Sequence, residues 1–143
     1  MNGCERGASS DQGDRRNSRM TPARRYVAEG LGSAMLLAIV VGSGIMAERL
    51  AGGNIAIALL ANAIATGAGL IALILMLGTV SGAHFNPVVT LSEAWQKNMP
   101  MSDVLPYIAA QLIGAFAGVA TAHLMFGDPC SSLLSTCRFT MVW

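Results

Sequence analysis

The residues with the clearest capacity for chemistry lie in the segment Ser81–Leu91, which reads SGAHFNPVVTL. Asn86 is a favoured N-cap residue and Pro87 a favoured first helical residue, so this pair predicts a short helix that begins there. We expect the helix to end near Trp95, because lysine, asparagine and proline follow closely. The free N–H groups at the start of such a helix attract dipolar or anionic solutes and oppose cations and protons. The segment therefore predicts contact with a passing solute.

A second set of polar residues has the types needed for catalysis. Glu29, His84 and either Ser81 or Ser43 could supply an acid, a base and a nucleophile. No nucleophile elbow, metal pair or cofactor loop accompanies them, and the two glycines that flank Ser43 are better explained by close helix packing. The sequence therefore predicts no enzyme, no catalytic residue, no metal site and no cofactor.

Three long apolar blocks surround these residues in a chain that is 53% hydrophobic and 12% charged. The blocks are Val27–Ala47, Ile55–Leu77 and Val104–Phe126. Each reaches the roughly 20 residues that a transmembrane helix needs, and the first is too long for the apolar region of a signal peptide. We therefore predict an all-α membrane protein. The expected helices are about 25–48, 54–78 and 103–126, with a half-helix at 87–96.

The half-helix is too short to cross a membrane. Ten residues at about 1.5 Å each give roughly 15 Å, about half of a hydrocarbon core roughly 30 Å thick. Irregular backbone such as Ser81–Phe85 is tolerated at membrane depth only where it is buried in protein or lines a water-filled cavity. The sequence therefore predicts a re-entrant loop beside such a cavity.

A pair of small residues in the third block suggests close helix contact. Gly114 and Gly118 form a GxxxG motif, which lets two helix backbones approach each other. We interpret this pair as packing within the chain, with contact between subunits as the alternative.

The two ends of the chain differ from its middle. Six arginines precede the first block against three acidic residues, so the positive-inside rule predicts a cytoplasmic N-terminus, and we expect the bacterial inner (plasma) membrane. Such arginines could also contact nucleic acid or anionic lipid, but the interspersed acids favour a disordered, solvated tail and no nucleic-acid partner. We predict a tail at 1–23, one domain at 24–127, and an unrelated tail at 128–143.

Two details of the tails are less informative. Met20 is an alternative start, because the sequence from there leads directly into the first block. Cys4, Cys130 and Cys137 have no spacing typical of a metal site, and we treat them as incidental, although the last two could pair.

Ser81–Thr90 resembles the signature of the aquaporin and glycerol-facilitator family, the major intrinsic proteins. Ala28–Ser33 is similar to the opening of the family's first helix, and Tyr107–Gly114 to its third helix. The resemblance covers about residues 25–127. It implies one of the two inverted repeats of such a channel, each with three helices and one half-helix, whose Asn-Pro motifs meet at the midplane.

The resemblance also implies roles for single residues. Asn86 would donate a hydrogen bond to the solute, and Pro87 would pack against the opposing motif. Glu29 and Gln111 would brace the loop without touching the solute. The backbone carbonyls that form the acceptor ladder of the cytoplasmic half-pore would come from Gly82, Ala83, His84 and Phe85.

Two positions depart from the family's pattern. Val88 replaces the alanine of the signature and enlarges the side chain at the motif. Thr66 falls where water-selective members place an aromatic in the narrow filter, so it implies a wider, more polar constriction. These pore-lining predictions favour glycerol-like polyols or metalloid hydroxides in addition to water.

Two functional hypotheses follow from the resemblance. The first is passive transport of water or small uncharged solutes across the lipid bilayer, in a homo-oligomer that the family would make a tetramer. The second is a truncated, non-conducting membrane fragment of such a channel, because the chain resembles one repeat only.

Overall fold

The computed structural model describes residues 21–127, and these residues form four α-helices. The helices are α2 (Pro22–Leu50), α3 (Ile55–Ser81), α4 (Pro87–Trp95) and α5 (Met101–Phe126). Helices α2, α3 and α5 are each long and apolar enough to span a membrane. The predicted fold class, an all-α membrane protein with three spans and one short helix, is confirmed. The predictions for the cysteines, Met20 and both tails fall mainly on residues 1–20 and 128–143, outside the described part.

The long helices extend beyond their predicted bounds. α2 begins at Pro22, which lies in the predicted tail, and α3 continues to Ser81. The helix stops there because Gly82 adopts a left-handed conformation, with φ of 95°, and its N–H donates to the Gly78 carbonyl at 3.1 Å. Hydropathy marks only the apolar part of each helix, whereas caps of this kind determine where the helix ends.

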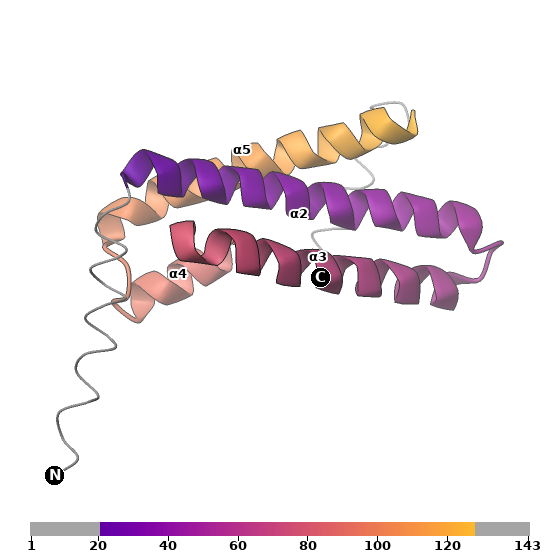
Figure 1. Ribbon diagram of the computed structural model, residues 1–143, viewed down its shortest axis with the longest axis horizontal. Coiled ribbons are helices and arrows are strands. Elements are labelled where there is room, and N and C mark those ends of the chain that lie inside the picture. The colour runs from indigo at the N-terminus through magenta and orange to yellow at the C-terminus, as the bar shows by residue number, and fades with distance from the viewer. Residues whose placement is uncertain (1–20, 128–143) are drawn as a thin grey trace, which may run out of the picture.

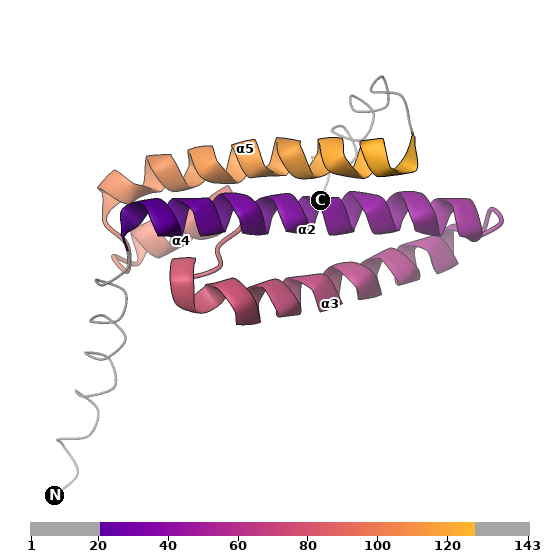
Figure 2. The same cartoon turned by 45° about the horizontal axis from the view of Figure 1, so that its top comes forward.

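The three long helices pack side by side (Figures 1 and 2). A short turn reverses the chain between α2 and α3, and two glycines in it, Gly52 and Gly53, have φ of 56° and 88°. Asn54 then caps α3 by accepting a hydrogen bond from the Ile57 N–H at 3.3 Å. α5 runs parallel to α2, because Gly30 faces Gly114 and, one turn on, Ala34 faces Gly118.

The contact between α2 and α5 depends on glycine. A Cβ atom at Gly114 would overlap the Gly30 carbonyl group, and one at Gly118 would overlap that of Ala34. The two backbones therefore touch, as small-xxx-small pairs allow in membrane helices. The interpretation of the GxxxG pair as packing within the chain is confirmed. At the far end, the Arg49 guanidinium donates to the Phe126 carbonyl at 3.2 Å and joins the two helix ends.

The contact between α2 and α3 contains a polar pair within the apolar region. The Ser43 hydroxyl donates to the Asn62 side-chain oxygen at 2.7 Å. A Cβ atom at Gly44 would lie in ordinary contact with the same amide, at 3.8–3.9 Å. Further along, Gly69 accommodates the Ile39 side chain.

Replacing Ser43 by alanine should weaken the contact between α2 and α3 by about 0.5–1.5 kcal/mol, because it removes one interhelical hydrogen bond. The measurement is the free energy of unfolding, obtained by adding SDS to the detergent-solubilised chain and following helix content by circular dichroism. Ser102→Ala is the control, because Ser102 is exposed. Equal values for the two variants would contradict the prediction.

Candidate functional site

The segment after α3 enters the bundle and returns to the same end. Residues 82–86 fold back beside α2, and α4 then runs outward again (Figure 2). Ser81 at the start of the segment and Met99 beyond its end line one cavity. The nine residues of α4 span about 14 Å at about 1.5 Å each, less than half of a hydrocarbon core.

The tip of this segment carries an amide with one free side. The Asn86 side-chain oxygen accepts from the Val88 N–H at 2.8 Å and so caps α4, while Pro87 occupies the first turn. The Asn86 side-chain nitrogen has no hydrogen-bond partner among residues 21–127. Because Asn86 is exposed, this N–H₂ group is available as a donor at the N-terminus of α4.

Glu29 holds the loop from α2. This side chain is fully buried, and its two carboxyl oxygens accept from the backbone N–H groups of His84 at 3.0 Å and Phe85 at 2.8 Å. Gln111 on α5 donates to the same carboxyl group at 2.9 Å. One buried side chain therefore joins α2, α5 and the re-entrant loop.

These bonds determine where the loop carbonyls point. Every peptide bond in the described chain is trans, so each carbonyl points opposite to the N–H of the next residue. Because the N–H groups of His84 and Phe85 point towards Glu29, the carbonyls of Ala83 and His84 point away from it. Neither carbonyl accepts a hydrogen bond from another described residue. The loop thus presents two free acceptors on the side opposite α2.

Thr90 is the centre of a second group of hydrogen bonds. Its hydroxyl donates to the Asn86 carbonyl at 3.2 Å and accepts from Gln111 at 2.9 Å. The His84 Nδ1 lies 3.2 Å from the same oxygen. When the hydroxyl proton is directed to the Asn86 carbonyl, the His84 ring donates to this oxygen from Nδ1. The imidazole thus braces the loop against α4.

Tyr107 and Arg25 tie the loop to the helix ends. The Tyr107 hydroxyl, fully buried on α5, donates to the Ser81 carbonyl at 2.9 Å. The Arg25 guanidinium lies 5.4 Å from the Tyr107 ring centroid and 3.5 Å from the Asp103 carboxylate. Sequence reasoning missed Thr90, Tyr107 and this ion pair. Thr90 and Tyr107 lie within segments that carry the resemblance, and the available signal was a polar side chain on the inward face of a helix.

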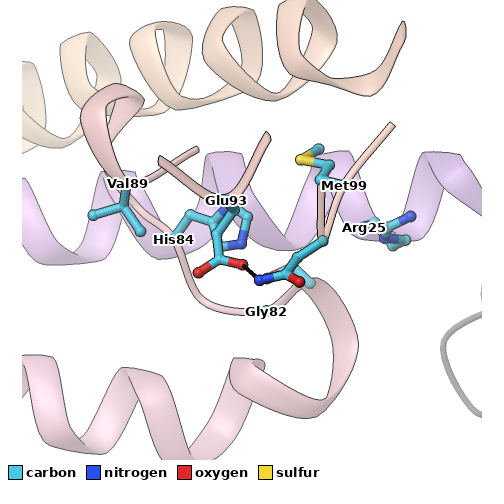
Figure 3. A pocket seen from close by; sticks show the side chains of 8 residues that line it. Arg25, Gly82, His84, Val89, Glu93 and Met99 are labelled. Atoms are coloured by element: carbon cyan, nitrogen blue, oxygen red, sulfur yellow. Dashed lines mark hydrogen bonds between the residues drawn. The ribbon is translucent and has the colours of Figure 1, made fainter. Parts of the chain in front are cut away.

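A cavity of about 310 Å³ opens beside the loop (Figure 3). Polar and charged groups form most of its wall. They include the His84 imidazole, the Arg25 guanidinium and the pair formed by Asn98 and Glu93, whose side chains are hydrogen-bonded at 3.0 Å. The Arg25 Nε atom is buried and has no partner among the described residues. The polar side chains in the wall can thus offer hydrogen bonds to a small polar molecule.

The other predicted pore-lining residues occupy three different environments. Val88 is 71% exposed beside the N-terminus of α4. The Phe85 side chain is buried against α2, so only its backbone could meet a solute. Thr66 is half-buried on α3, about 22 Å along the helix axis from Ser81 at about 1.5 Å per residue. The structure therefore does not bring Thr66 close to the loop.

The residues considered for catalysis are not arranged as a triad. Glu29 contacts the backbone of His84 and not its ring. The Ser81 hydroxyl is hydrogen-bonded to the Leu77 carbonyl and the Ala83 N–H, and Ser43 is bonded to Asn62. Within residues 21–127, no group of three metal-ligating side chains comes together.

The sequence of the chain is similar to those of known proteins. Residues 16–139 match the major intrinsic protein family. The chain is 54% identical to aquaglyceroporin AqpS of Rhizobium meliloti (strain 1021) over 106 residues, which cover 74% of this chain and 45% of that protein. It is 33% identical to aquaporin Z of Rhodopseudomonas palustris (strain ATCC BAA-98 / CGA009) over 101 residues, covering 71% and 41%. Aquaporin NIP1-1 of Oryza sativa subsp. japonica is 43% identical over 65 residues, covering 46% and 23%.

The matches show the family of the chain and a difference in length between the chain and its relatives. The chain spans about half the length of the first two curated relatives that it matches. The family match includes all four described helices, the buried Glu29 and the Asn86-Pro87 tip. The chain is thus an integral membrane protein that belongs to the major intrinsic protein family.

Proposed function

We propose that the re-entrant loop and α4 form one half of a pore for water and small uncharged solutes, such as glycerol or metalloid hydroxides. The observation that carries this proposal is the pair of free carbonyls at Ala83 and His84. At membrane depth, unpaired backbone groups cost several kcal/mol each unless water or a polar solute meets them. A wet path along this side of the loop removes that cost.

The donors and acceptors of the loop suit an uncharged solute. Two carbonyls accept hydrogen bonds and the Asn86 side-chain nitrogen donates one, so a hydroxyl or a water molecule can exchange its hydration for these contacts. The N-terminus of α4 carries partial positive charge and opposes cations and protons. No step of this transport makes or breaks a covalent bond, and we propose no enzymatic activity.

The remaining pore-lining predictions enter the proposal as constraints on solute size. The polar cavity beside His84 is the proposed mouth of the path. Val88, exposed at the helix tip, would narrow the path or pack against an opposing motif. Thr66 would contribute at the other end of α3. The name of the aquaglyceroporin relative supports a polyol among the solutes.

We propose that the end of the bundle with Arg25 and the cavity faces the cytoplasm. Six arginines precede the apolar part of α2, and the positive-inside rule keeps such a segment on the cytoplasmic side. The inner membrane of a bacterium is the proposed location, because the first two relatives are bacterial. A homo-oligomer, a tetramer by family resemblance, is part of the same proposal.

A second candidate function is a membrane fragment that does not conduct. The observation that favours it is the single re-entrant half-helix among residues 21–127, whereas the family resemblance implies two that face each other. A single half-helix leaves one side of the path unenclosed.

Reconstitution separates the two candidates. The full chain is placed in proteoliposomes, and vesicle volume is followed by light scattering after an osmotic step with sucrose, and then with glycerol. The channel proposal predicts water permeability at least fivefold above empty vesicles, with re-swelling in glycerol. Permeability equal to that of empty vesicles would contradict it and support the fragment.

Asn86→Ala should reduce the water permeability in excess of that of empty vesicles at least tenfold relative to the unchanged chain, because the proposed donor at the tip is lost. Osmotic shrinkage of proteoliposomes measures this change. Asn54→Ala is the matched control, since Asn54 caps α3 in the same way but lies outside the loop. Both variants lose about 1 kcal/mol of capping stabilisation. An equal loss of permeability in both would mean that Asn86 acts only as a cap.

A further inference from the structure

A notch in α2 holds the ring of Phe85. Gly32 lies one turn after Glu29, and a Cβ atom at Gly32 would overlap three atoms of this ring, with Cζ only 2.7 Å away. Phe85 is 5% exposed, so its ring fills the space that the missing side chain leaves. Gly114 and Gly118 differ, because a Cβ atom there would meet backbone. Gly32 thus contacts the loop rather than a neighbouring helix.

The loop backbone at this point is in an unfavourable conformation. Phe85 has φ of 48° and Ala83 has φ of 53°, in the left-handed region that residues with a Cβ avoid. Such residues keep this conformation only where the surroundings impose it. Two contacts impose it at Phe85: the N–H bond to Glu29 at 2.8 Å and the ring in the notch.

We propose that Gly32 is a positioning residue for the re-entrant loop. By admitting the ring, it holds Phe85 in the left-handed conformation, and Phe85 sits between the free His84 carbonyl and Asn86. Glu29 and Gly32 lie three residues apart on one face of α2. Glu29 therefore accepts the hydrogen bond of the Phe85 N–H, while Gly32 contacts the Phe85 ring. The effect on transport rests on the proposed channel function, whereas the effect on the loop does not.

A methyl group at Gly32 cannot be absorbed locally. The ring is rigid and buried, so it must leave the notch, and the loop backbone at Phe85 then loses this anchor. The N–H groups of His84 and Phe85 then separate from the Glu29 oxygens. The structure therefore predicts a local opening of the loop while the helices remain formed.

Hydrogen exchange of the full chain in lipid nanodiscs tests this inference. Gly32→Ala should speed exchange of the amides of residues 84 and 85 at least tenfold. Gly67→Ala is the matched control, because a Cβ atom at Gly67 meets nothing within 4 Å, and it should change these rates less than twofold. Equal acceleration of the α3 amides in Gly32→Ala would indicate general unfolding and overturn the proposal.

A double-mutant cycle isolates the contact itself. Phe85→Ala should also speed exchange of these amides, because the ring no longer anchors the loop. In that background Gly32→Ala should add less than twofold, since the methyl group then has space. If the increase in exchange rate in the double variant equalled the product of the increases in the two single variants, the proposal would be overturned.

A transport measurement separates the inference from the proposed function. Gly32→Ala should lower the water permeability in excess of that of empty vesicles at least fivefold and change the ratio of water to glycerol permeability. If the unchanged chain does not conduct, the channel proposal fails and the exchange rates alone decide the role of Gly32. In a further outcome, the unchanged chain conducts while Gly32→Ala speeds amide exchange and leaves permeability unaltered. That result would overturn the link between loop position and transport.

Discussion

Glu29→Ala should destabilise the protein by about 3–5 kcal/mol and open the re-entrant loop. The substitution leaves the N–H groups of His84 and Phe85 without their acceptor and removes one of the two bonds of the Gln111 amide nitrogen. Each buried donor left without a partner costs about 1–3 kcal/mol. The two residues that lose their bonds adjoin the free carbonyls, so the proposed path should close as stability falls.

The free energy of unfolding in SDS, followed by circular dichroism, measures the loss. Glu48→Ala is the matched control, because Glu48 is an exposed carboxyl side chain on the same helix. Glu29→Gln keeps one acceptor oxygen but turns an N–H₂ group towards the other loop amide, so we expect an intermediate loss of about 1–3 kcal/mol. A loss in Glu29→Ala no larger than in Glu48→Ala would mean that the loop is held by its other contacts.

Local rules predicted the elements of this fold. Blocks of apolar residues long enough to span a membrane gave α2, α3 and α5, and Asn86 with Pro87 gave the start of α4 to the residue. Such signals are contained in one stretch of chain, so they can be read without knowledge of the rest. The helix ends were less accurate, because α3 continues through polar Ser81 until the conformation of Gly82 stops it.

The contacts that hold the loop were not predictable in the same way. Phe85 meets Gly32 across more than fifty residues of sequence, and nothing in either neighbourhood marks the other. Ser43 and Asn62 pair only because α2 and α3 reverse at a particular register. The bracing role of Glu29 came from family resemblance and not from spacing. Contacts of this kind depend on how the helices dock, which periodicity and hydropathy do not specify.

Gly114→Ala should destabilise the protein by up to about 2 kcal/mol, in the opposite direction to its intrinsic effect on a helix. In an isolated helix, alanine is more favourable than glycine by about 1 kcal/mol. At Gly114, however, the added methyl group would overlap the Gly30 carbonyl group. Backbone cannot rotate away as a side chain does, so α2 and α5 must separate. Overpacking of this kind costs about 1–3 kcal/mol. Separation also lengthens the 2.9 Å bond between Gln111 and Glu29.

The sign of the change in the free energy of unfolding distinguishes the effect of close packing from that of helix propensity. Gly67→Ala, at a position open on α3, should stabilise the protein by up to about 1 kcal/mol because only the propensity term applies. SDS unfolding of both variants gives the two values in one experiment. If Gly114→Ala were also stabilising, the contact between α2 and α5 would have to adjust to the added methyl group without a loss of stability. The hydrogen bonds of Glu29 would then not depend on glycine between these helices, and neither would the position of the loop.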